Sequence, residues 1–247
     1  MMRERLCIKS LQNIMNKKIQ LFCVPFAGGS EVSFKEMISL LDERIEAVPI
    51  EYPGRGRRKA DAVYEKMDEL ILDVKRQIES ARNKNIPFAL MGYSMGCEIV
   101  FDLAQSVLEE SPAYLFLAAR EAIKYDTRGH DYCLLDKDEF ARRIVELGGI
   151  DQRLTRDKRF LDIYMRHIYE DYKLLHDYVY KPEKGPIRQN TTVFYSEKDT
   201  PFAKVEEWKE VVTGTIDFYE FGDNHFFINQ YAKEMADIIS DKLLGCI

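Results

Sequence analysis

The sequence lacks the features that mark several common classes of protein. No apolar run among the 247 residues approaches the length of a membrane span, and the basic N-terminal stretch has no apolar core of signal-peptide length. There is no internal repeat and no low-complexity linker. A formal net charge of -6 and a pI near 5.4 argue against a nucleic-acid partner. We therefore expect neither a membrane protein nor a nucleic-acid-binding protein.

Cysteine is sparse, and its spacing matches no metal or redox motif. The five cysteines are Cys7, Cys23, Cys97, Cys133 and Cys246. They are odd in number and lack the CxxC spacing of zinc and redox sites. This pattern predicts reduced thiols in a cytoplasmic protein, with Cys23 and Cys97 acting as small buried hydrophobes.

The length suits a single α/β domain, which we place at residues 19–247 after an N-terminal extension at 1–18. Short segments rich in β-branched and aromatic residues predict strands at 19–24, 46–51, 88–93, 114–119, 191–196 and 215–221. Apolar residues at helical spacing predict helices at 31–42, 64–81, 95–109, 137–147, 157–177, 204–212 and 230–242. This alternation predicts a mostly parallel sheet with helices on both faces. The strand-free stretch at about 120–184 is expected to form a helical lid.

The most informative segment is Gly92-Tyr93-Ser94-Met95-Gly96, which ends an apolar run and begins a helical pattern. This is the nucleophile elbow of an α/β-hydrolase, in which a serine stands on a strained turn between strand and helix. The two glycines let the neighbouring chains pass without a Cβ clash. Ser94 is the expected nucleophile; the alternative is an ordinary serine on a glycine-flanked surface turn.

A nucleophilic serine needs a base, and the chain has only four histidines. His130, His167 and His176 fall within the predicted lid, whereas His225 directly follows the last predicted strand, 215–221. In hydrolases of this kind the base lies in that loop, after the nucleophile and the acid. We therefore predict His225 as the general base, with a surface or loop-capping role as the alternative.

The acid that orients the histidine is expected after an earlier strand. Asp199 and Glu197 compete for this role in the loop that follows the fifth predicted strand. Asp199 is preferred, because its side chain is shorter and it lies at the turn before Pro201. Asp223 and Asp217 are weaker alternatives, the first too near the histidine in sequence and the second inside a strand.

Two backbone N–H groups are expected to hold the oxyanion. The N–H of Met95 lies at the start of the helix after Ser94, where the helix dipole also favours negative charge. The second donor is expected from the loop at 25–30, which reads PFAGGS, with Ala27 preferred over Phe26. The small residues there are equally consistent with a tight turn.

A further cluster at 51–58, EYPGRGRR, places Arg55, Arg57 and Arg58 on a loop with little side-chain bulk. In an acidic chain this is a local basic patch that could attract a phosphate or an acidic partner. A solvated loop is an equally good interpretation.

Taken together, these motifs resemble the stand-alone type II thioesterases, the external editing enzymes of nonribosomal peptide and polyketide synthases. The resemblance spans nearly everything from residue 19 to residue 239, and the lid segment 134–149 shares it. It departs at 118–130, where the family usually has a small-residue, arginine-rich stretch. The motifs that carry it are LFCVPFAGGS at 21–30, EYPGRGRR at 51–58, FALMGYSMG at 88–96 and FYEFGDNHFFI at 218–228.

The resemblance implies hydrolysis of an acyl or aminoacyl thioester carried on the phosphopantetheine arm of a carrier protein. Ser94, Asp199 and His225 would form the triad, and no metal or organic cofactor would be needed. The carrier is then a separate partner in trans, and because carrier domains are typically acidic, Arg55, Arg57 and Arg58 are hypothesised to help dock it or to contact the pantetheine phosphate. A monomer is the default expectation for the enzyme. The alternatives are a general carboxylester hydrolase with the same triad and a non-catalytic acyl-binding module.

Overall fold

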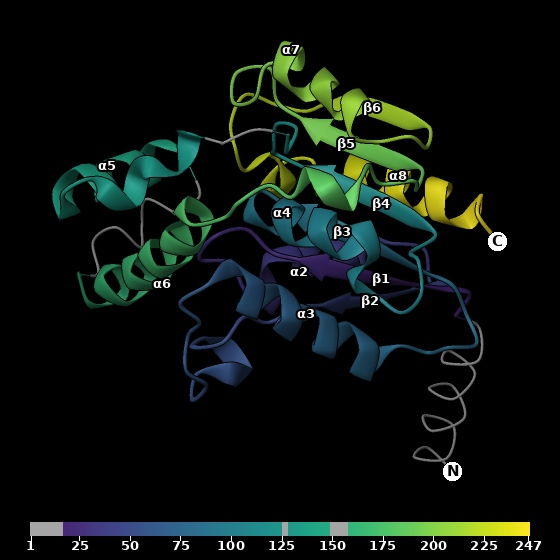
Figure 1. The fold of residues 1–247 in the computed structure, drawn as a ribbon, viewed down its shortest axis with the longest axis horizontal. Coiled ribbons are helices and arrows are strands. Elements are labelled where there is room, and N and C mark those ends of the chain that lie inside the picture. The colour runs from purple at the N-terminus through teal and green to yellow at the C-terminus, as the bar shows by residue number, and fades with distance from the viewer. Residues whose placement is uncertain (1–16, 125–127, 149–157) are drawn as a thin grey trace.

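The computed structural model describes residues 17–124, 128–148 and 158–247, and its centre is a six-stranded parallel sheet (Figure 1). The strand order is β2-β1-β3-β4-β5-β6. The predicted N-terminal extension, 1–18, lies outside the described residues except for its last two. The strands are β1 (Ile19–Val24), β2 (Ile45–Pro49), β3 (Phe88–Tyr93), β4 (Tyr114–Ala118), β5 (Thr191–Tyr195) and β6 (Ile216–Glu220).

Helices cover both faces of this sheet, so the expected α/β architecture is confirmed (Figure 1). No helix within the described ranges combines the length and the apolarity that crossing a membrane requires. The α-helices are α2 (Lys35–Ser39), α3 (Met67–Ala81), α4 (Met95–Asp102), α5 (Lys137–Glu146), α6 (Lys158–His176), α7 (Phe202–Val205) and α8 (Ala232–Leu244). The 3-10 helices are η1 (Glu31–Phe34), η2 (Gly56–Arg58), η4 (Arg128–Leu134), η6 (Pro182–Lys184), η7 (Glu206–Glu210) and η8 (Phe227–Asn229).

Three predicted helices are divided in the structure. The segment 31–42 forms η1 and then α2, and the segment 95–109 changes from α4 to a π-helix, η3 (Leu103–Val107). The helix predicted at 204–212 begins two residues earlier, at Phe202, with Pro201 at its N-cap. After one turn that helix tightens into the 3-10 helix η7.

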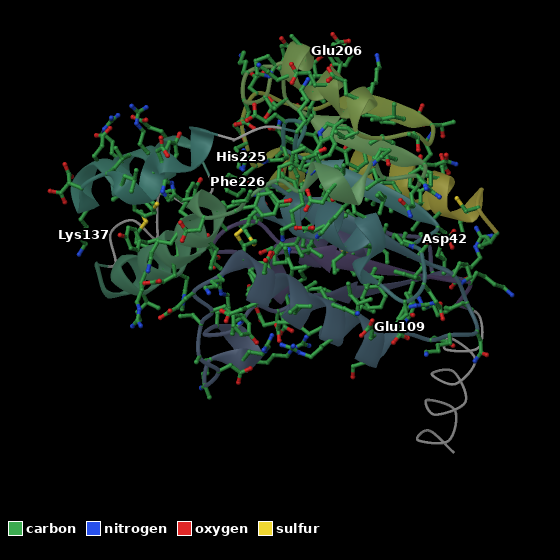
Figure 2. The ribbon with its side chains drawn as sticks, viewed as in Figure 1. Asp42, Glu109, Lys137, Glu206, His225 and Phe226 are labelled. Carbon is green, nitrogen blue, oxygen red and sulfur yellow. The ribbon has the colours of Figure 1, made fainter. Side chains whose placement is uncertain are left out.

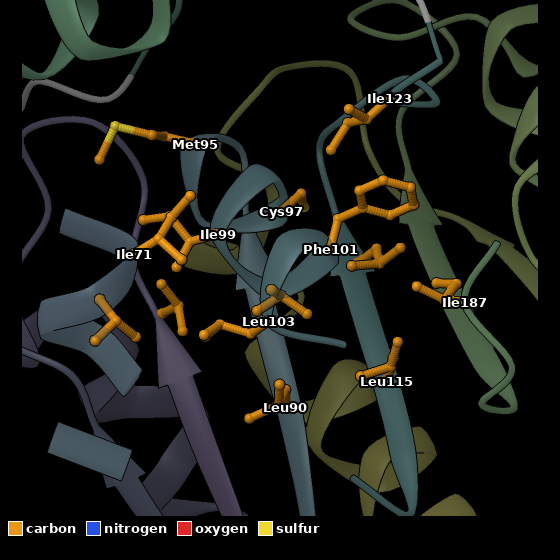
Figure 3. Close-up of a cluster of buried hydrophobic side chains, with 14 of the residues drawn as sticks. Ile71, Leu90, Met95, Cys97, Ile99, Phe101, Leu103, Leu115, Ile123 and Ile187 are labelled. Atoms are coloured by element: carbon orange, nitrogen blue, oxygen red, sulfur yellow. The ribbon is translucent and has the colours of Figure 1, made fainter. Parts of the chain in front are cut away.

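Strands β1, β3, β4 and β5 are buried along their whole length because the sheet is packed on both faces. Alternate residues of each strand enter opposite layers of the core. One layer packs against α3 and α4, and the other against α2 and α8. Figure 3 shows part of the first layer, a cluster that contains Leu90 and Leu115 of the sheet and Ile99 and Phe101 of α4.

Helices α5 and α6 stand apart from the sheet, beyond the carboxyl ends of the strands (Figure 1). They share a small apolar cluster of their own, built on Phe140 and Ile144 of α5 and Ile168 of α6. They occupy the stretch where the sequence predicts a lid, and their side chains line the cavity described next.

Candidate active site

Ser94 lies on the sharp turn between β3 and α4 with φ 49° and ψ −116°, a conformation that costs a non-glycine residue about 1–3 kcal/mol. The turn is held by a 2.8 Å hydrogen bond from the Ser94 N–H to the carbonyl of Ala118. A Cβ on Gly92 would lie 2.5 Å from the Gly96 carbonyl oxygen, and one on Gly96 would lie 2.2 Å from that of Val24. The elbow therefore requires glycine at both positions.

The structure brings the three predicted triad residues into one hydrogen-bonded chain. His225 Nε2 lies 2.9 Å from Ser94 Oγ, and His225 Nδ1 lies 2.8 Å from Asp199 Oδ2. Because a carboxylate can only accept, Nδ1 carries the proton, and Nε2 is left to accept from the serine hydroxyl. The three residues follow β3, β5 and β6, whose carboxyl ends meet at the same edge of the sheet.

The competing carboxylate has another partner. Glu197 Oε2 accepts a 2.9 Å hydrogen bond from the N–H of Phe202, at the start of α7. Asp199, in contrast, is bound on Oδ2 by the histidine and also by the hydroxyl of Thr200, at 3.0 Å. The local geometry thus gives Glu197 a helix-capping position and Asp199 the position beside the imidazole.

The sequence did not predict the roles of two buried side chains: Tyr93, which holds the backbone of His225, and Glu98, which holds the cavity-lining Arg120. The hydroxyl of the fully buried Tyr93 donates a 2.7 Å hydrogen bond to the carbonyl of His225. Glu98, one turn after the nucleophile, is fully buried and pairs at 2.7 Å with Arg120, which follows β4. The only available signals were a buried tyrosine, whose hydroxyl needs a partner, and a glutamate in an apolar helix.

Two cavities flank Ser94 and His225. They lie at the edge of the sheet that faces α5 and α6, where Figure 2 labels His225. The larger, of about 170 Å³, is lined by Met95, Arg120 and residues 199–201. The smaller, of about 20 Å³, is lined mostly by apolar side chains. Helix α6 and the end of α5 supply walls to both, through Tyr172 and Leu147.

The predicted oxyanion donors line the two cavities that flank Ser94. Met95 lines the larger cavity and Ala27 the smaller, and Ser94 lines both. We call residues 25–30 the oxyanion loop. Within the described residues, the N–H of Ala27 donates to no protein acceptor, whereas the next N–H groups along the loop are all bonded. The alternative donor, Phe26, also lines the smaller cavity.

The three arginines of residues 51–58, which we call the arginine loop, have different surroundings. Arg55 is not at the surface: its side chain is 6% exposed and is bound through both terminal nitrogens to Asp171 of α6. Arg58 pairs with Asp73 and Asp61. Arg57 is 57% exposed, with Glu31 at 3.1 Å. Helix α6 covers this side chain, so the structure gives Arg55 no exposed surface for docking a carrier.

The described parts of the chain contain no group of three or more His, Cys, Asp or Glu residues placed to hold a metal ion. The chemistry that this arrangement supports is nucleophilic attack by a serine hydroxyl, with a histidine as proton acceptor and a carboxylate to orient it.

Comparison with known proteins places this geometry in context. A family model described as "Thioesterase domain" matches residues 19–243. The chain is 28% identical over 231 residues to the gramicidin S biosynthesis protein GrsT of Aneurinibacillus migulanus, covering 92% of this chain and 89% of that protein. It is 28% identical over 247 residues to thioesterase PikA5 of Streptomyces venezuelae, covering 97% and 86%. The solved type II thioesterase BorB from the borrelidin biosynthetic cluster superposes with a TM-score of 0.80 at 25% identity, covering 91% of this chain and 92% of that one.

Proposed function

This chain belongs to the thioesterase family, and from that premise we propose that it is a stand-alone type II thioesterase. Its substrate is an acyl or aminoacyl group bound as a thioester to the phosphopantetheine arm of a carrier protein, and its task is to free stalled or misprimed carriers. The observation that carries the proposal is the chain of hydrogen bonds from Ser94 through His225 to Asp199 beside a cavity. GrsT and BorB, which belong to biosynthetic systems for natural products, support the choice of carrier.

The first half-reaction transfers the acyl group to the enzyme. His225 Nε2 takes the proton of Ser94 as its Oγ attacks the thioester carbonyl carbon. The N–H groups of Met95 and Ala27 hold the negative oxygen that forms. When the carbonyl re-forms, the carbon–sulfur bond breaks, and the pantetheine sulfur leaves with the proton from His225. Asp199 keeps the imidazole in the required tautomer and stabilises its positive form.

The second half-reaction returns the enzyme to its starting state. His225 removes a proton from a water molecule, whose oxygen attacks the acyl-serine carbonyl. The same two N–H groups hold the second oxyanion. Ser94 then leaves with the proton from His225, and the free acid is released. Every proton moves through one imidazole, so this route calls for no cofactor.

Docking of the carrier is proposed to involve the arginine loop, because carrier domains are typically acidic. With Arg55 buried, Arg57 has the most exposed side chain of the three. Arg57→Glu should raise the KM for an acyl-carrier protein and leave the KM for acyl-pantetheine unchanged. An unchanged KM for the carrier would remove Arg57 from the docking surface.

We also propose that the enzyme is a monomer in the cytoplasm. Buried free thiols at Cys23 and Cys97 support a reducing compartment. Sedimentation equilibrium of the purified chain would test the monomer, and a dimer mass at micromolar concentration would contradict it.

The proposed function is tested by loading a carrier protein with acetyl or aminoacyl groups and following the mass of the intact carrier. We expect the chain to release free carrier and Ser94→Ala to release none. An oxygen ester of equal acyl length is the matched substrate. Cleavage of that ester with no turnover of the carrier thioester would identify a general carboxylester hydrolase instead.

A further inference from the structure

Asp171 on helix α6 contacts the oxyanion loop directly, although 143 residues separate it from its partner there. Its Oδ2 accepts a 2.7 Å hydrogen bond from the N–H of Gly28, the residue after Ala27. Both of its carboxylate oxygens accept 2.7 Å bonds from the guanidinium of Arg55. Arg55 also donates to the carbonyl of Gly29, at 3.1 Å. The pair therefore joins the oxyanion loop, the arginine loop and α6.

The pair is buried, with side chains of Arg55 and Asp171 that are 6% and 4% exposed. Charge-assisted, two-pronged bonds of this kind fix geometry strongly. Desolvation offsets much of their contribution to stability, so stability alone is a weak reason for a buried ion pair. The pairing also neutralises the carboxylate, so no net negative charge from Asp171 opposes an oxyanion nearby.

The hydrogen bond to Gly28 acts on the donor next to it. The N–H of Gly28 and the carbonyl of Ala27 belong to one rigid peptide plane, so Asp171 fixes the orientation of that plane. The N–H of Ala27 belongs to the preceding peptide plane, which is joined to it at the Cα of Ala27, so the bond restricts this N–H through the backbone angles of Ala27. The N–H of Gly29 donates to the Phe26 carbonyl at 2.8 Å, and the N–H of Ser30 donates to a serine hydroxyl at 2.9 Å. The loop thus occupies its later N–H groups and leaves that of Ala27 for a ligand oxygen.

Packing holds α6 against the same plane. Gly28 has φ +77°, and a Cβ there would lie 2.3 Å from Cγ1 of Ile168, three residues before Asp171 on α6. At the start of the loop, the Tyr52 hydroxyl donates a 2.7 Å bond to the carbonyl of Pro25. The oxyanion loop is therefore held at its beginning, its middle and its end.

We propose that Asp171, held by Arg55, is a positioning residue that sets the Ala27 N–H for oxyanion binding. This inference rests on the proposed function, because it assigns a purpose to the oxyanion loop. It gives α6 a part in transition-state stabilisation, and it gives Arg55 a role other than carrier docking.

The experiment compares Asp171→Asn, the double variant Arg55→Met/Asp171→Leu and the control Asp73→Asn. Asp73 is a matched control because it also pairs with an arginine of the arginine loop but does not contact the oxyanion loop. For each we would measure kcat and KM on S-acetyl-pantetheine and the melting temperature. The affinities for a trifluoromethyl ketone analogue, which forms an oxyanion with Ser94, and for its carbonyl-free thioether complete the set.

We expect kcat of the double variant to fall about 10²-fold with KM nearly unchanged, the typical effect of a misplaced catalytic group. Affinity for the ketone should fall by a similar factor, and affinity for the thioether should not change. Asp171→Asn should shift both quantities in the same direction, because its amide group cannot satisfy Arg55. The Asp73→Asn control should keep the wild-type kcat.

The melting temperature distinguishes a positioning role of Asp171 from a merely structural one. The double variant leaves no unpaired charge in the core, but the Gly28 N–H and the Gly29 carbonyl lose their partners, so its melting temperature should fall by several degrees while the protein still folds. Wild-type kcat in that folded variant would overturn the positioning role. If the double variant does not fold, wild-type kcat and ketone affinity in Asp171→Asn would overturn it equally. A wild-type enzyme that hydrolyses no thioester would instead overturn the proposed function.

Discussion

The strained backbone of Ser94 leads to a prediction about stability that is independent of substrate. Ser94→Ala and Ser94→Gly both remove the nucleophile, and they differ only in the presence of Cβ. At φ 49° and ψ −116° a Cβ is unfavourable, whereas glycine accepts this region without a steric cost. We therefore expect Ser94→Gly to be the more stable of the two inactive variants.

The size of the difference follows from two opposing effects. Relief of backbone strain should stabilise the folded glycine variant by about 1–3 kcal/mol. The extra freedom of glycine in the unfolded chain opposes this by about 0.4–1 kcal/mol. Taking the middle of each range, the net gain should be about 1.3 kcal/mol. For a domain of this size that corresponds to a melting temperature about 3–5 °C higher.

Thermal unfolding followed by circular dichroism, with urea titration as a second measurement, would test the prediction. Arg76, an exposed residue in the interior of α3, gives a matched control with the opposite sign. In a helix interior, glycine is less stable than alanine by about 1 kcal/mol, so Arg76→Gly should melt below Arg76→Ala. Equal or lower stability of Ser94→Gly relative to Ser94→Ala would refute the assignment of strain to this turn.

Three further predictions concern the surroundings of the triad. Asp199→Asn should lower kcat by about 10⁴-fold through loss of the required tautomer, whereas Glu197→Gln should change kcat little, as measured by thioester hydrolysis. Tyr93→Phe leaves the carbonyl of His225, the proposed base, without its donor, and should lower stability by about 1–3 kcal/mol in urea unfolding and reduce kcat. Burial raises the pKa of the Cys97 thiol, whereas Cys246 is exposed. Iodoacetamide at pH 8 should therefore label Cys246 in the native protein and leave Cys97 unlabelled until urea is added. Peptide mass spectrometry would measure the labelling, and labelled Cys97 in the native protein would contradict the prediction.

Local patterns explain why much of the fold and site could be predicted. The limits of β1 and β3 were predicted at both ends, because each is a short apolar run bounded by turn residues. Ser94 directly follows β3, and His225 lies in the loop after β6, so both positions could be predicted from where a strand ends. Their side chains meet because parallel strands bring their carboxyl ends to one edge.

Contacts between distant segments could not be predicted in this way. Arg55 is as polar in sequence as Arg57, and only the position of α6 decides that one is buried and the other exposed. Asp171 carries no motif, since a single carboxylate on an amphipathic helix normally faces water. Its role depends on three segments meeting, which a one-dimensional pattern does not encode.

The position of β6 has a consequence for how the enzyme fails under stress. β6 is one of the two edge strands of the sheet and is only partly buried, yet the loop after it carries His225. β3, which leads to Ser94, is fully enclosed. Segments with few buried contacts open at lower free energy than the core does. Fraying of this single edge would separate base from nucleophile while the other strands stay paired. Denaturant should therefore abolish turnover at concentrations where the sheet is still largely intact.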